Sequence, residues 1–321
     1  MKKKVLGSLL ISIFLFFLPI GLTNQALLHF CIVSMLYIII SSSLKMIMDT
    51  GQVSIGHSAF MAIGAYTSSL LTLKAGFNFY LAFILSGISS GFIAFLIGIP
   101  ILRIKGFYFA IVTFALCEVV RMIVTSWVSV FGGANGITDI AWPEPLSLGF
   151  IRLSFDTKAS YYYLVLIVML SCLIVIWRIG ASFYGRIFKS IEESDEYAHS
   201  LGINVDTYKM FTFCLSCFFA GLAGSLYAHY MHYISPGAFT FWLSVEFIIM
   251  VIVGGRESKY GPIFGSLFFV VAPELLRATE VFQGLFFAVS FLIVLFILPK
   301  GLAGLSDLVG KRFVGINPQR G

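Results

Sequence analysis

The 321-residue sequence predicts an all-α protein folded as one polytopic bundle of transmembrane helices. Hydrophobic residues make up 59% of the chain and phenylalanine occurs 34 times, so a soluble domain would have too little polar surface to cover its core. The apolar runs are near 20 residues long, a length that crosses a bilayer as a helix, whereas alternating shorter segments would indicate a β-barrel. We therefore expect a single membrane domain over residues 1–321.

About ten membrane segments are expected along the chain. Their approximate limits are 5–22, 26–47, 52–73, 79–101, 107–130, 159–179, 207–231, 242–254, 261–277 and 282–298. The third and eighth segments are the weakest, which predicts short or broken helices there. Residues 131–158 form the long outer loop, and the prolines and glycines in it predict a structured cap or an irregular segment rather than another span.

The basic residues fix the expected orientation. Most of the 21 lysines and arginines fall on one side of the predicted membrane, and only Lys74, Arg152, Lys158 and Arg277 fall in loops on the other. The positive-inside rule then places both termini and the loop 180–206 in the cytoplasm. This distribution accounts for the net charge of +6, and no basic stripe interleaved with aromatic residues indicates nucleic-acid binding.

The sequence carries no pattern of an enzyme or a metal site. The five cysteines fall inside apolar spans, and Cys214 and Cys217 have no second Cys or His pair at metal-ligand spacing. The chain also lacks a GxxxxGK[ST] loop, an HExxH motif and a GxSxG motif. We expect no catalytic residues, no metal and no ATP bound by this chain.

A charged stretch at 186–203, RIFKSIEESDEYAHSLGI, interrupts this apolar sequence. Ser190 and Glu193 have the spacing of a capping box, and Gly202 could end a helix of about 11 residues, too short to span a bilayer. An apolar face is predicted on this helix, made of Ile187, Ile191, Ala198 and Leu201. The stretch is either a solvated loop helix or a docking helix that inserts this face into a soluble partner.

Polar residues at the start of the third segment mark a candidate pathway. Gln52, Ser54 and His57 need partners inside a membrane, and the glycines beside them permit the segment to break. The eighth segment is also short and flanked by breakers, and two such segments in opposite halves indicate a substrate site between pseudo-repeats. His57 is either a packed, hydrogen-bonded histidine or a proton relay.

Two further places join the candidate pathway. Glu118 and Arg121 lie three residues apart on the fifth segment and can neutralise one another, either as a pair that locks helices together or as part of a pathway. Asn135 lies in the loop GGANGI (132–137), which either presents backbone amides to an anionic group or forms a simple turn.

Six stretches of this sequence resemble, in order, the membrane-spanning permease subunits of ABC importers for branched-chain amino acids, of the LivM type. They are GQVSIGHSAFMAIGAYTSSLL (51–71), KGFYFAIVTFALCEVVRMIV (105–124), GGANGI (132–137), GRIFKSIEESDEYAHSLGI (185–203), FFAGLAGSLYAHYMHYISPGAF (218–239) and IVGGRESKYGPIFGSLFFVVAPELLR (252–277). The resemblance implies that the whole chain is one permease domain and that 186–203 is a coupling helix seated in a groove of a cytoplasmic ATPase.

The importer motif E-A-A-x-x-x-G is matched by Glu196, Tyr197, Ala198 and Gly202, with Tyr197 in place of the middle alanine and without the I-x-L-P tail of the fuller motif. The candidate coupling residues implied by the resemblance and the helix pattern are Ile191, Glu192, Glu193, Glu196, Tyr197, Ala198, Leu201 and Gly202.

The resemblance also implies partners and a location. It implies a second homologous permease, cytoplasmic ATP-binding subunits that use ATP and Mg²⁺, a substrate-binding protein outside, and the bacterial cytoplasmic (inner) membrane. Urea and short-chain amide importers share this architecture, so the solute stays open. A secondary transporter driven by an ion gradient, with Glu118, His57 and Glu246 as ion or proton sites, is the alternative from another class. A channel with a regulatory loop has little support, because no filter motif is present.

Overall fold

A computed structural model describes residues 24–104, 106–148, 151–275 and 301–304, together with the single positions 19 and 292. Within these residues every long element is a helix, and the strands form one short antiparallel hairpin of β1 (Leu146–Leu148) and β2 (Ile151–Leu153). The predicted all-α fold is confirmed in this part of the chain. The predicted segments 5–22 and 282–298 lie outside the described residues.

Five helices in the described residues are long and apolar enough to cross a membrane. They are α2 (Gln25–Met48), α4 (Phe79–Ile101), α5 (Phe107–Ser126), α7 (Lys158–Ala181) and α10 (Val205–Met231). At about 1.5 Å per residue, the 24 residues of α2 extend about 36 Å, which exceeds the ~30 Å hydrocarbon core of a bilayer. These limits agree with the predicted segments to within a few residues.

Side-chain caps start several of these helices. Asn78 Oδ1 accepts a hydrogen bond from the Leu81 amide at 2.9 Å, and Thr157 Oγ1 accepts one from the Ser160 amide at 3.2 Å. Such caps satisfy amides that have no partner inside the helix. They therefore fix the starts of α4 and α7 at the polar residues that follow each loop.

Helix α10 forms the centre of the bundle, packed against α2, α3 (His57–Leu73) and α4. Glycines let the backbones touch: a side chain at Gly64 of α3 would collide with the backbone of Gly221 of α10, and one at Gly224 would collide with the Met61 carbonyl. Close approach at small residues is the usual way that membrane helices pack, because lipid gives no hydrophobic force between them.

Three of the expected membrane segments contain helices that are shorter, within the described residues, than a bilayer is thick. These helices are α3 with 17 residues, α11 (Phe241–Gly254) with 14 and α12 (Gly261–Leu275) with 15. The predicted third segment is helical only from His57, because residues 49–56 form a non-helical linker in which Gly51 has a φ of +77°. The break expected at these glycines is therefore present, and α11, about 21 Å long, is short as predicted.

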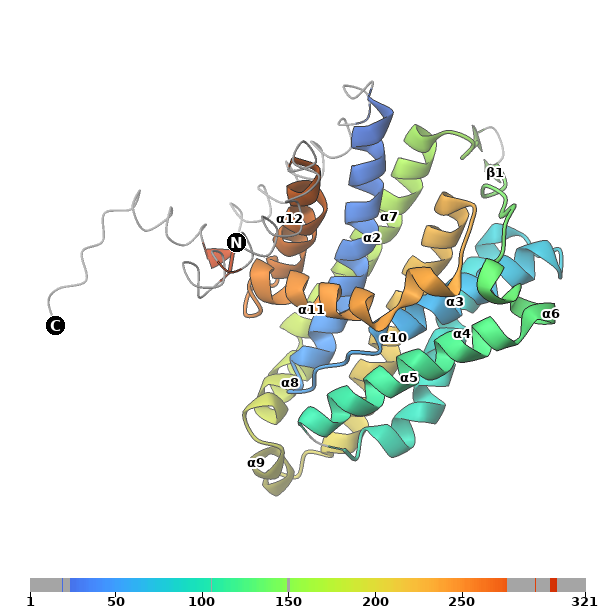
Figure 1. Ribbon diagram of the computed structural model, residues 1–321. Coiled ribbons are helices and arrows are strands. Elements are labelled where there is room, and N and C mark those ends of the chain that lie inside the picture. Colours follow the sequence, from blue (N-terminus) through green and yellow to red (C-terminus); the bar gives the residue numbers. More distant parts are fainter. Residues whose placement is uncertain are drawn as a thin grey trace, which may run out of the picture.

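The two ends of the bundle carry different structures (Figure 1). One end has α6 (Val128–Phe131), the 3₁₀ turn η1 (Gly133–Asn135) and the β hairpin, and a β-bridge between Ile137 and Ile234 joins this loop to the segment before η2 (Pro236–Phe239). The opposite end has α8 (Phe183–Glu193) and α9 (Asp195–Ser200). The loop 131–158 is thus structured, as predicted, and lies away from the charged stretch.

Candidate functional site

The charged stretch is two helices rather than the single helix that its sequence predicts. Helix α8 ends at Glu193, Ser194 is extended (φ −163°, ψ 117°), and α9 begins at Asp195. The predicted capping box is wrong, since Ser190 lies inside α8. The residues that cap the two helices are Ser182, which accepts from the Tyr184 amide, and Ser194, which accepts from the Tyr197 amide at 3.2 Å.

Gly202 ends α9 as expected. It has a φ of +81°, and its amide donates to the His199 carbonyl at 2.9 Å, while the Ile203 amide donates to the Ala198 carbonyl at 3.1 Å. This pair of bonds is a Schellman motif, which satisfies carbonyls at the helix end and needs a residue that tolerates positive φ. The end of the stretch is therefore fixed by its own backbone.

The apolar side of the stretch packs on the chain itself. Ile187, Ile191, Ala198 and Val205 form a small buried cluster, with Ile191 only 2% exposed. Leu201, predicted to share this face, is 60% exposed, because the break at Ser194 turns α9 relative to α8. The side chains of Ile191 and Ala198 are thus not available to a partner, contrary to a helix that inserts this face into one.

The accessible side of the stretch exposes carboxylates and two large side chains around α9. Glu193 and Glu196 are exposed, Tyr197 is 63% exposed, and Leu201 lies beside them in sequence after α9. The Asp195 carboxylate is 2.7 Å from the ammonium of buried Lys209 on α10, which ties the start of α9 to the bundle. The start of α9 is therefore held in place, and the side chains offered to solvent include two carboxylates around α9 and two basic groups, Arg186 and Lys189, on α8.

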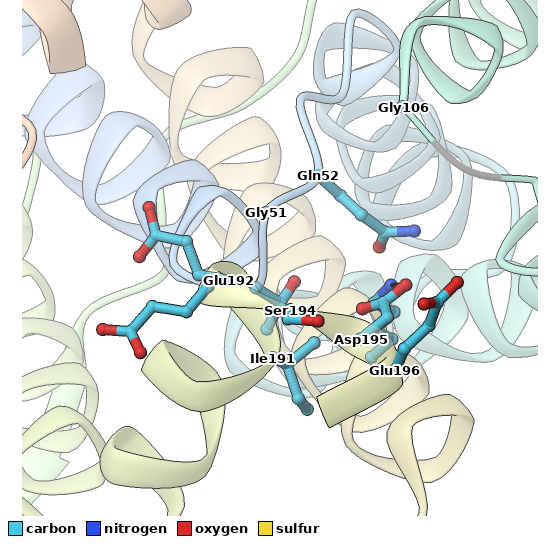
Figure 2. Close-up of a pocket in the computed structure, with 11 residues that line it drawn as sticks. Gly51, Gln52, Gly106, Ile191, Glu192, Ser194, Asp195 and Glu196 are labelled. Carbon is cyan, nitrogen blue, oxygen red and sulfur yellow. Dashed lines mark hydrogen bonds and ion pairs between the residues drawn. The ribbon is translucent and has the colours of Figure 1, made fainter. Parts of the chain in front are cut away.

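A cavity of about 310 Å³ lies between this stretch and the α2–α3 linker (Figure 2). Gln52 lines it from the linker, and Glu192, Ser194, Asp195 and Glu196 line it from the break between α8 and α9. The Gln52 side chain is 3% exposed, and neither of its amide atoms has a hydrogen-bond partner within the described residues. Gln52, a predicted pathway residue, thus lies against the predicted coupling residues.

Glu192 connects the stretch to two distant segments. Its carboxylate forms an ion pair with Arg256, which lies in the turn between α11 and α12, and Arg256 Nη2 donates to the Met48 carbonyl at 2.8 Å. Gly51 lies directly against the Glu192 backbone, since a side chain there would come within 3.5 Å of the Glu192 Cα. The end of α2, the end of α8 and the α11–α12 turn therefore meet at one point.

The other linker residues are enclosed by the chain. His57 is fully buried, and its Nε2 lies 3.0 Å from Ser43 Oγ on α2. Ser54 is also fully buried, and its hydroxyl has no partner within the described residues. The His57 Nε2 contact agrees with the packed, hydrogen-bonded interpretation, while His57 Nδ1 has no partner within the described residues.

The starts of the short helices α3 and α11 are joined directly. The Ser58 amide donates to Ser244 Oγ at 2.8 Å, and the Ser244 hydroxyl donates to Ser58 Oγ at 2.8 Å. Ser58 Oγ also lies 3.2 Å from Cys117 Sγ on α5 and donates to the Thr240 carbonyl. The two weak segments of the sequence are thus brought together, as the pseudo-repeat hypothesis expects, through Ser244, which sequence reasoning missed.

Glu118 and Arg121 form the ion pair that their spacing predicts, with 2.7 Å between Glu118 Oε2 and Arg121 Nη2. Both side chains stay partly exposed, on a helix most of whose surface this chain does not bury. The fully exposed positions of α4 are all apolar, as are those of α5 except Ser126, so the charged, partly exposed pair is what distinguishes α5. The uncovered side of α5 therefore differs chemically from that of α4.

Asn135 lies apart from the other candidate residues. It is exposed in η1, which follows α5 and α6 in the chain, whereas Gly106, just before α5, lines the cavity together with Gln52. The loop around it is tight: Gly132, Gly133 and Gly136 all have positive φ. The structure thus separates Asn135 from Gln52 by the length of α5. Within the described residues no cluster of three or more His, Cys, Asp or Glu side chains could hold a metal ion.

Residues 26–298 match the family model described as the branched-chain amino acid transport system permease component. This match covers nearly all of the chain and includes both weak segments and the charged stretch. The chain belongs to this permease family. As members of the family are membrane permeases and the described chain has several apolar helices, the permease is a multi-pass membrane protein.

Curated relatives of the permease carry matching names. It is 33% identical over 289 residues to the high-affinity branched-chain amino acid transport permease LivM of Salmonella typhimurium, and 32% identical to that of Escherichia coli K12. In both cases the alignment covers 84% of this chain and 68% of the relative. A probable LivM of Methanocaldococcus jannaschii is 25% identical over 198 residues, which cover 61% of this chain and 55% of that protein. No solved structure matches the permease significantly.

Proposed function

We propose that this permease forms half of the translocation pathway of an ABC importer for branched-chain or related amino acids. The family supports this function, as do relatives named for branched-chain amino acid transport. The observation that carries the coupling role is the α8–α9 surface. It exposes Glu193 and Glu196 around α9, is tied to α10 by the Asp195–Lys209 ion pair and lies at one end of the bundle, while its apolar side is already filled.

The proposed partner at this surface is a cytoplasmic ATPase that binds ATP and Mg²⁺, and this chain binds neither. Glu193, Glu196, Tyr197 and Leu201 are the coupling residues that a partner could contact, whereas Ile191 and Ala198 hold the two helices together. The exposed Glu193 and Glu196 call for basic side chains opposite α9 on the ATPase, and the exposed Arg186 and Lys189 for acidic ones opposite α8, because complementary charge steers association and fixes the docked orientation.

The proposed topology has about ten spans in the bacterial inner membrane, with both termini in the cytoplasm. Residues 180–206 then lie inside and 131–158 outside, where a substrate-binding protein would deliver the solute. Two observations support this orientation. The loop 131–158 and the α8–α9 stretch lie at opposite ends of the bundle, and α2 carries Lys45 in the last turn before the α8 end, as the positive-inside rule requires.

The uncovered side of α5 is the proposed place of a second, homologous permease and of the pathway between the two. A charged pair exposed to lipid is costly, so such pairs face protein or water within a membrane. Glu118 and Arg121 therefore suit a face that a second subunit or a water-filled path covers, whereas the apolar exposed face of α4 suits lipid.

Transport assays in membrane vesicles test this function. Uptake of leucine, isoleucine or valine that requires ATP, the ATPase subunits and the binding protein supports the proposal. Uptake abolished by an uncoupler alone would instead indicate an ion-gradient transporter, conductance without any partner would indicate a channel, and preferential uptake of urea or acetamide would indicate the related amide importers.

Charge reversal tests the coupling surface. Glu193→Lys combined with Glu196→Lys is expected to uncouple ATPase stimulation from uptake while the permease still inserts, because these two exposed charges are reversed without touching the buried cluster. Glu144→Lys with Asp156→Lys, two exposed changes at the other end, should leave ATPase co-purification unchanged. Normal transport by the Glu193/Glu196 variant would refute the coupling assignment.

A further inference from the structure

The meeting point of Glu192, Arg256 and Met48 lies between the proposed coupling surface and the interior of the bundle. Glu192 is in the last turn of α8, next to exposed Glu193, and it pairs with Arg256, which is 64 positions away in the sequence. Asp195, by comparison, pairs with Lys209 of α10, the helix that directly follows α9 in the chain. The Glu192 pair therefore joins the stretch to a part of the fold that is not its chain neighbour.

Arg256 lies just after the C-terminal end of the short helix α11. Helix α11 runs from Phe241 to Gly254, and its last turn is held by backbone bonds from Leu302 to Val253 (2.8 Å) and from Ala303 to Gly254 (2.9 Å). At its other end Ser244 is bonded to Ser58, at the start of α3. A displacement of the α11–α12 turn is thereby passed along α11 to the junction of the two broken segments.

The second contact of Arg256 joins it to the end of α2, and from there the chain leads to the start of α3. Its Nη2 donates to the Met48 carbonyl at the end of α2, and the linker that follows Met48 leads through Gly51 and Gln52 to the start of α3. Both contacts come from Nη2, which carries two hydrogens and so can donate to the Glu192 carboxylate and to the Met48 carbonyl at once. One side chain thus fixes α8 to both segments that converge on Ser58.

We propose that Arg256 is a positioning residue that transmits the movement of α8 to α11 and to the α2–α3 linker through its contacts with Glu192 and the Met48 carbonyl. This inference rests on the proposed coupling function. ATPase movement displaces α8 and α9 as a unit, since a shared apolar cluster joins them, and Arg256 carries that displacement to the starts of α3 and α11. Loss of Arg256 leaves the docking surface intact but disconnects it from the pathway.

The test uses the complete importer reconstituted in liposomes and measures solute transported per ATP hydrolysed. Arg256→Gln is expected to lower this ratio at least about fivefold, the lower end of the range for coupling between sites. The ATPase subunits should still co-purify with the variant, because Glu193, Glu196 and Tyr197 are unchanged. The matched control is Lys259→Gln, which removes the same charge from the same turn; Lys259 lies over the Trp177 and Tyr260 rings and should leave the ratio at its wild-type value.

A double-mutant cycle separates transmission from general damage. Glu192→Gln and Arg256→Gln are expected to lower the ratio to similar extents, and their combination to lower it little further, because both remove one connection. Glu192→Arg with Arg256→Glu restores the ion pair and should recover part of the ratio. A wild-type ratio in Arg256→Gln, or effects that simply add in the double variant, would overturn the inference.

Two further measurements distinguish a failure of this inference from a folding defect and from a failure of the proposed function. If Arg256→Gln does not insert, Glu192→Gln is measured instead, because it removes the carboxylate that Arg256 contacts; a lowered ratio is expected, and a wild-type ratio overturns the inference. The wild-type complex tests the proposed function separately. If it shows no ATP-driven uptake, the importer assignment fails, whereas a coupled wild type with an equally coupled Arg256→Gln variant refutes the transmission role alone.

Discussion

Ile191→Ala is expected to loosen the α8–α9 unit without touching its exposed carboxylates. The Ile191 side chain is 2% exposed in the cluster with Ile187, Ala198 and Val205, and the change removes three carbon groups from it. At about 0.8 kcal/mol for each buried methylene, the local unfolding free energy falls by about 2.4 kcal/mol. This lies near the lower end of the ~2–5 kcal/mol found for such core truncations, as suits a small cluster.

Hydrogen exchange of the peptide 183–203 measures this effect in the purified permease. A loss of about 2.4 kcal/mol corresponds to local opening that is roughly fiftyfold more frequent, so protection of the α8 amides should fall by that factor if α8 opens as a unit. Leu201→Ala, at a position that is 60% exposed, is the control: exchange should stay unchanged while affinity for the ATPase falls by up to about 1 kcal/mol. Wild-type protection in Ile191→Ala would refute the buried cluster as the element that holds the stretch together.

Two further predictions concern the packing of the broken helices. Gly64→Ala places a methyl group against the Gly221 backbone and should destabilise the bundle by about 1–3 kcal/mol, seen as a lower melting temperature in detergent; Gly180→Ala, with open space around it, is the control and should melt normally. Ser244→Ala removes both hydrogen bonds to Ser58 and should cost about 1 kcal/mol and reduce transport, while Ser171→Ala, which loses only a bond to its own helix, should do neither.

The main helices could be predicted from sequence because their signals are local. The predicted segment 79–101 coincides with α4, since Asn78 caps its start and Pro100 and Leu102 lie at its end. The break in 186–203 could not be predicted in the same way. Ser190 and Ser194 are both possible helix caps, and the choice between them depends on whether Ala198 reaches the Ile187 and Ile191 side chains, which is a tertiary contact.

The contacts that organise the candidate site are between distant positions. Ser58 and Ser244 are 186 residues apart, and the Glu192–Arg256 pair is 64 apart. The sequence marks the polar third segment and the glycine-flanked eighth segment, so it indicates the two elements but not Ser244, which joins them. From the sequence, Arg256 contributes only to the positive-inside prediction of membrane orientation, because the surrounding residues GGRESKYGP do not reveal which carboxylate it faces.

The buried cluster beneath α8 and α9 has a consequence for how an importer would be assembled. Because Ile187, Ile191 and Ala198 are buried within this chain, the stretch needs no ATPase to fold or to cover these three side chains. An ATPase would then meet a finished surface, with little ordering entropy left to offset its binding energy, and charge rather than refolding would set the rate of encounter. This stretch of the membrane subunit would then be folded before an ATPase binds, so the order in which the subunits are synthesised need not matter.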